Sequence, residues 1–65
     1  MIALLRGTVA FRSLKHVIVD VGGVGYQVFM SDTDLGRVGI EGSHIALHTH
    51  LHVREDVMDL YGFFS

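Results

Sequence analysis

Two adjacent acidic residues, Glu55 and Asp56, are of a type that could take part in general acid–base catalysis. They follow Arg54 and stand between two strand-like runs, so the segment predicts a tight hairpin tip. Side chains of neighbouring residues on such a tip point apart and remain hydrated, which makes them poor partners in proton transfer. We therefore predict no catalytic role for the pair. From the residues alone, its simplest role is to keep the tip soluble.

Histidines suggest a second kind of chemistry, metal binding. His48, His50 and His52 alternate along one predicted strand, so they share a face at a spacing of roughly 6.5–7 Å. His44 precedes them on the same face. A catalytic metal would also need a further ligand, an open coordination position and supporting carboxylates, and Asp59 is the obvious candidate. We predict a half-exposed face, or a face covered by another domain, with no metal and no cofactor. A metal-dependent enzyme fragment is kept as a rival interpretation.

Neither the serines nor the glycine cluster predicts a catalytic site. No serine lies in a G-x-S-x-G context, and they fall in predicted turns or at the terminus: Ser13, Ser31, Ser43 and Ser65. The run Gly22–Gly25 does not complete G-x-G-x-x-G, because Val28 stands at the third glycine position. It also leads into a strand-like stretch, so no helix N-terminus is offered to a phosphate. We predict a hairpin turn whose glycines supply positive φ angles.

Aromatic side chains could stack on nucleic-acid bases, although in so small a domain they are more often core or interface. The candidates are Tyr26, Phe29, Tyr61 and Phe63. The five basic residues are spread along the chain without forming a stripe: Arg6, Arg12, Lys15, Arg37 and Arg54. With a formal net charge of -2, the chain does not have the composition of a free-standing polyanion binder.

Alternation of apolar and polar residues predicts mostly strands. Gly7 within the first run indicates a bulge or tight bend there. A short helix is predicted over 31–39, with Ser31 or Asp32 as N-cap and Gly39 as its end, followed by a turn at 41–42. The strands are predicted over residues 2–11, 16–21, 26–30, 44–53 and 57–64.

This order of three strands, a short helix and two strands is that of the OB-fold. The predicted fold class is therefore all-β, a small five-stranded Greek-key barrel with one short helix between strands 3 and 4. One face of the fourth strand is expected to point inward, namely Ile45, Leu47, Thr49, Leu51 and Val53. In the last strand one face should be core and the other should meet a neighbouring domain or subunit. Its two faces are Met58, Leu60 and Gly62, and opposite them Val57, Asp59, Tyr61 and Phe63.

The length of 65 residues and 49% hydrophobic content indicate one small folded domain. With no Cys, disulfides and thiolate zinc sites are excluded, and a complete enzyme is improbable at this length. The apolar stretch Met1 to Leu5 is too short for a signal-peptide core or a membrane span.

Three motifs together resemble the N-terminal domain of the RuvA family, and the resemblance runs along essentially the whole chain. Ala3 stands where that family commonly has glycine. The last motif is the most specific of the three. The motifs are Met1-Ile2-x-x-Leu5-Arg6-Gly7, Asp20-Val21-x-Gly23-Val24-Gly25-Tyr26-x-Val28, and Thr49-His50-x-x-Val53-Arg54-Glu55-Asp56, which runs on into Leu60-Tyr61-Gly62-Phe63.

The resemblance implies that residues 1–65 are an OB-fold domain, and that the helix-hairpin-helix and C-terminal domains of the family are absent from this chain. It implies a cytoplasmic, non-ATPase subunit that forms tetramers, sometimes octamers, and holds four-way DNA junctions during recombination, DNA repair and the SOS response. The implied protein partners are the RuvB ATPase, which binds through the absent C-terminal domain, and the RuvC resolvase. No membrane is implied.

The same resemblance gives the acid pair a role that composition does not. Glu55 and Asp56 match the acidic pin that the family projects toward the crossover of the junction. Arg54, Tyr61 and Phe63 become candidate DNA or interface contacts. A generic OB-fold module that binds single-stranded nucleic acid or oligosaccharide is the alternative function.

Overall fold

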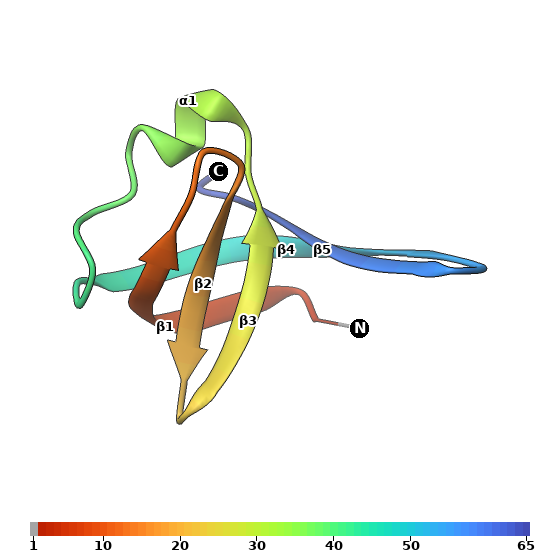
Figure 1. Ribbon diagram of the computed structural model, residues 1–65, viewed down its shortest axis with the longest axis horizontal. Coiled ribbons are helices and arrows are strands. Elements are labelled where there is room, and N and C mark those ends of the chain that lie inside the picture. The colour runs from red at the N-terminus through yellow and green to blue at the C-terminus, as the bar shows by residue number, and fades with distance from the viewer. Residues whose placement is uncertain (1) are drawn as a thin grey trace.

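The computed structural model describes residues 2–65 as an all-β domain with one short helix (Figure 1). Its elements, in chain order, are β1 (Leu4–Arg12), β2 (His16–Val21), β3 (Val24–Phe29), α1 (Asp32–Leu35), β4 (His44–Arg54) and β5 (Val57–Phe63). The predicted order of three strands, a helix and two strands is confirmed. Met1, with which the apolar N-terminal stretch and the first family motif begin, lies outside the described residues.

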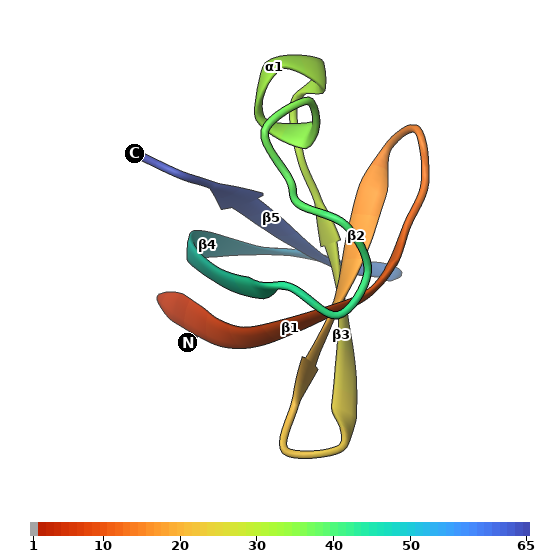
Figure 2. The same cartoon turned by 90° about the vertical axis from the view of Figure 1, so that its left-hand side faces the viewer.

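The strands close into a barrel in the order β1-β2-β3-β5-β4, and β1 pairs back onto β4. Figure 2 shows β1 curving from the side of β4 toward β2, which lets one strand serve both halves of the barrel. Pairing is antiparallel throughout except between β3 and β5, which run parallel over two residue pairs. This is the predicted OB-fold barrel.

Side chains that alternate along the strands fill the barrel, as the period of two requires. The most deeply buried are Val9, Val17, Val19, Val28 and Leu47. The inward face predicted for β4 is confirmed for Ile45, Leu47 and Thr49, which are all buried. The prediction is wrong for Val53, which is 60% exposed because β4 continues beyond the barrel at that point.

The irregularity predicted at Gly7 lies further along β1. The register between β1 and β2 shifts between Val9 and Phe11, which places the bulge at Ala10. Gly7 has a different role, since a β-carbon there would collide with the backbone oxygen of Asp20 on β2. The missing side chain therefore lets β1 and β2 approach closely where β1 passes from β4 to β2.

The turn between β2 and β3 is formed by Gly22 and Gly23, with φ angles of 61° and 93°, which confirms the predicted hairpin turn. In α1, the Ser31 hydroxyl accepts a hydrogen bond of 3.2 Å from the Asp34 N–H, as an N-cap does. The helix ends at Leu35, with Gly36 rather than the predicted Gly39 as its C-cap. It stops early because the chain tightens into i→i−3 hydrogen bonds that bring buried Val38 beside buried Leu35.

Candidate functional site

Strands β4 and β5 continue past the barrel as a two-stranded arm, which projects at the right of Figure 1. β5 pairs with β3 only at Leu60 and Tyr61, so the part of β5 before Leu60 has β4 as its partner. Beyond the pair Leu51–Leu60, three more residue pairs extend the arm, which corresponds to roughly 10 Å at the rise of a strand. The arm therefore carries its tip clear of the barrel surface.

Glu55 and Asp56 form the two-residue tip, because Arg54 and Val57 are the last paired residues. The tip predicted from sequence is confirmed, with Arg54 at the end of β4 rather than in the turn. Both acidic residues are exposed, and no side-chain hydrogen bond found within residues 2–65 uses either carboxylate. Two hydrated negative charges thus stand at the end of the arm.

The two faces of the arm differ in chemistry. One carries Val53 and Met58, which are 60% and 72% exposed. The other carries a polar contact, in which Arg54 Nε donates a 2.8 Å hydrogen bond to His52 Nε2. The His52 ring in turn meets the Tyr61 ring edge-on, with centroids 6.2 Å apart and planes at 77°. This linked group lies directly behind the acidic tip, and nothing in the sequence pattern indicated it.

A row of rings crosses the outer surface of the barrel from β1 to β4. Successive centroids lie 5.8–6.2 Å apart along Phe11, His16, Phe29, Tyr61 and His52. Of the four aromatics considered as candidates for base stacking, Phe29 and Tyr61 join this row. Phe63 instead stacks on His48 at 5.7 Å, and Tyr26 packs against the core. Phe11 and His16 were missed, because the sequence pattern does not give the strand register that places His16 opposite Phe29 and Phe11 near His16.

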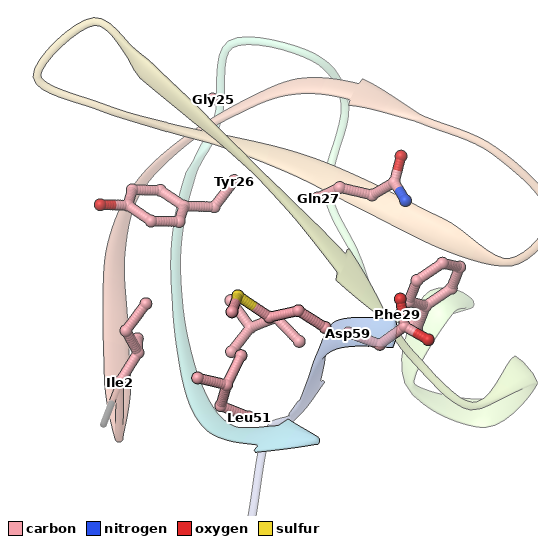
Figure 3. A pocket seen from close by; sticks show the side chains of 9 residues that line it. Ile2, Gly25, Tyr26, Gln27, Phe29, Leu51 and Asp59 are labelled. Carbon is pink, nitrogen blue, oxygen red and sulfur yellow. The ribbon is translucent and has the colours of Figure 1, made fainter. Parts of the chain in front are cut away.

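A groove of about 320 Å³ lies between β3, the start of the chain and the root of the arm (Figure 3). Ile2, Tyr26 and Leu51 line it with apolar surface, and Asp59 is its one charged residue. Besides Asp59, the Tyr26 hydroxyl is the titratable group of this lining, and most of the lining is apolar, so the groove suits contact with an apolar group.

The basic residues do not gather into a phosphate-binding surface. Arg12 Nη1 donates a 2.8 Å hydrogen bond to the Val38 carbonyl, and the Arg37 guanidinium carbon lies 5.2 Å from the Phe64 ring centre. With Arg54 held by His52, three of the five cations have contacts inside the chain. The domain therefore offers a polyanion scattered cations rather than a clustered basic surface.

The histidine face predicted for β4 points outward, with His44, His48 and His50 exposed and His52 half-buried. In the part of the chain that the structure describes, no group of three histidine, cysteine or acidic side chains lies close enough to hold a metal ion. Ser13 lies 2.9 Å from His16 Nδ1, but its hydroxyl oxygen also accepts from the backbone N–H groups of Lys15 and His16. Those bonds commit the hydroxyl to its turn rather than to nucleophilic attack.

No helix within residues 2–65 has the length and apolar character that crossing a bilayer would require.

Comparison with known proteins places this geometry in a family context. The family model described as "RuvA N terminal domain" matches residues 1–62. A protein of Stutzerimonas stutzeri, named Holliday junction branch migration complex subunit RuvA, is 51% identical over 63 residues, which are 97% of this chain and 31% of that protein. Proteins with the same name from Pseudomonas aeruginosa and Pseudomonas fluorescens are 52% and 51% identical, and 31% and 32% of their lengths are covered. The chain thus spans about a third of the length of these relatives.

Proposed function

Because the chain belongs to the RuvA N-terminal domain family, we propose that it supplies the part of a Holliday junction-binding subunit that faces the crossover of the junction. The observation that supports this proposal is the arm of β4 and β5, which carries two exposed carboxylates roughly 10 Å beyond the last pair at the barrel. The name shared by its relatives supplies the ligand class, a four-way DNA junction.

The tip acts as a separator of strands and not as a grip. A carboxylate 6 Å from a phosphate is repelled by about 1–3 kcal/mol, between a water-like and a surface-like dielectric. Several tips around one crossover would keep the phosphates of neighbouring DNA arms of the junction apart. They would also disfavour binding of a continuous duplex at the same place. Salt weakens this repulsion beyond a Debye length of about 8–10 Å.

Affinity for DNA comes from elsewhere in this proposal. The net charge of -2 and the scatter of the five cations along the chain leave the domain little counterion release to offer. Binding of the DNA backbone is assigned to helix-hairpin-helix motifs of a following domain. Docking of the RuvB ATPase is assigned to a C-terminal domain. Neither domain is within residues 1–65. In this proposal the subunit itself is non-catalytic and assembles as a tetramer or octamer. It acts in the cytoplasm together with RuvC, in recombination and DNA repair.

The test uses a chimera in which residues 1–65 replace the corresponding N-terminal part of the Pseudomonas aeruginosa relative. Its affinity is measured by fluorescence anisotropy for a four-way junction, a duplex and a single strand of matched length. We expect tight binding to the junction and much weaker binding to the other two. Equal affinity for junction and duplex would contradict the proposal. A preference for the single strand would favour the generic OB-fold alternative, with the ring row as its platform.

A further inference from the structure

Arg54 and His52, two residues apart on β4, are joined by a side-chain hydrogen bond. An arginine side chain has N–H donors, no acceptor, and is always charged in proteins. Arg54 Nε lies 2.8 Å from His52 Nε2, so His52 must offer a lone pair at Nε2. This bond requires the ring tautomer whose proton is on Nδ1.

Neighbouring groups hold this ring in place. Tyr61 on β5 meets it edge-on, and His52 is half-buried while Arg54 is exposed. Four charged or titratable groups lie around it besides Arg54 and Tyr61, counting both carboxylates of the tip. Asp59 lies directly opposite on β5, His50 is on the same face of β4, and the acidic tip lies beyond Arg54.

We propose that His52 is a positioning residue that holds Arg54 through Nε, so that the two Nη groups can clasp one phosphate of the DNA backbone beside the acidic tip. The proposal rests on the junction-facing function given above. Within residues 2–65 neither Nη group of Arg54 takes part in a side-chain hydrogen bond. A guanidinium whose Nε is already fixed loses less freedom when it binds a phosphate through two parallel bonds. The tip then repels phosphates in front of it while Arg54 retains one at its side.

Protonation of His52 reverses this arrangement. A proton on Nε2 removes the acceptor and sets a second positive charge against Arg54, so the guanidinium is released. Asp59, on the opposite strand, then attracts the imidazolium ring. The Arg54 contribution to DNA binding should therefore fall on acidification, although added positive charge on a protein ordinarily strengthens its binding to DNA. This opposite sign separates the proposal from a general electrostatic effect.

Three substitutions divide the roles of the ring. His52→Phe keeps a ring against Tyr61 and removes the acceptor. His52→Gln keeps an acceptor, the amide oxygen, and removes the titration. His50→Phe is the matched control, because His50 lies on the same face of the same strand and has no contact with Arg54.

The first experiment reads the ring directly in the 65-residue chain. Nitrogen NMR of ¹⁵N-labelled protein at about pH 8, above the range in which histidine ordinarily changes charge, shows which ring nitrogen of His52 carries the proton. We expect the proton on Nδ1 in the wild type, and a mixture of tautomers in Arg54→Met. A proton on Nε2 in the wild type would overturn the proposal.

The second experiment measures junction affinity of the chimera against salt at about pH 8 and about pH 5. At the higher pH, His52→Phe should lower the slope of log K against log salt by about 1, while His52→Gln and His50→Phe keep the wild-type slope. At the lower pH the wild type should fall to the slope of His52→Phe, and His52→Gln should not. An unchanged slope in His52→Phe would refute the phosphate contact. A chimera that binds no junction would refute the proposed function and the phosphate contact together, while the tautomer still decides the His52–Arg54 bond.

Discussion

Neutralising the acidic tip should reduce discrimination between a junction and a duplex without affecting the fold. The change is Glu55→Gln with Asp56→Asn in the chimera. Both replacements are nearly isosteric, both residues are exposed, and neither carboxylate is used in a side-chain hydrogen bond of the described residues. The free energy of unfolding should therefore move by less than about 0.5 kcal/mol, as checked by thermal melting.

The size of the effect on binding follows from Coulomb's law. One carboxylate at 6 Å from a phosphate contributes about 0.7 kcal/mol at a water-like dielectric and about 2.8 kcal/mol at a surface-like one. Affinity for the junction should hold or rise, and affinity for the duplex should rise more, because repulsion against the wrong ligand has been removed. The ratio of junction affinity to duplex affinity should therefore decrease by a factor of about 3 to about 100.

A competition titration of junction against duplex at two salt concentrations measures this ratio. The wild-type ratio should itself shrink at the higher salt, because exposed charges are screened. The matched control is Asp32→Asn with Glu41→Gln, which removes the same net charge from exposed positions of α1 and of the loop before β4. If the tip variant keeps the wild-type ratio at both salts, or if the control lowers the ratio equally, the tip is a solvated turn and its role as separator is wrong.

Three further outcomes are expected. The isolated 65-residue chain should show no junction binding at micromolar concentration and physiological salt, because its net charge is -2; a structure-selective gel shift would contradict this. In the chimera, Tyr61→Asp should weaken the oligomer or the domain packing, since Tyr61 is a 43% exposed member of the ring row; unchanged sedimentation and melting would make that face ordinary surface. Gly7→Ala should lower the free energy of unfolding by about 1–3 kcal/mol, because the added methyl group collides with the Asp20 carbonyl. Gly36→Ala is the control and should not lower it, because Gly36 has helical backbone angles and room for a methyl group. Equal denaturant midpoints for the two variants would refute the close-approach argument.

Local chemistry was readable from the sequence. Alternating residues such as Ile45, Leu47 and Thr49 predict which face of β4 is buried, because a strand places successive side chains on opposite sides. The hairpin turn at Gly22 and Gly23 and the acidic tip are equally local, since a two-residue turn depends on the residues within it and beside it. The order of such elements along the chain was enough to predict the OB-fold.

Strand register and barrel closure decided which residues of the hairpin leave the barrel and which side chains meet on its surface. The parallel pairing of β3 with β5 starts at Leu60, and that single fact turns the preceding part of the hairpin into an exposed arm and leaves Val53 in solvent. That pairing also sets Phe29 beside Tyr61, while the β4–β5 register sets His52 beside Tyr61, and together they assemble the ring row from residues far apart in the chain. A shift of one residue in pairing would move every side chain to the other face, and the apolar pattern alone does not say where β5 meets β3. The sequence by itself therefore determined the barrel and the charge at the hairpin tip, whereas the reach of the arm and the full ring row exist only once β5 has paired with β3 and the barrel has closed.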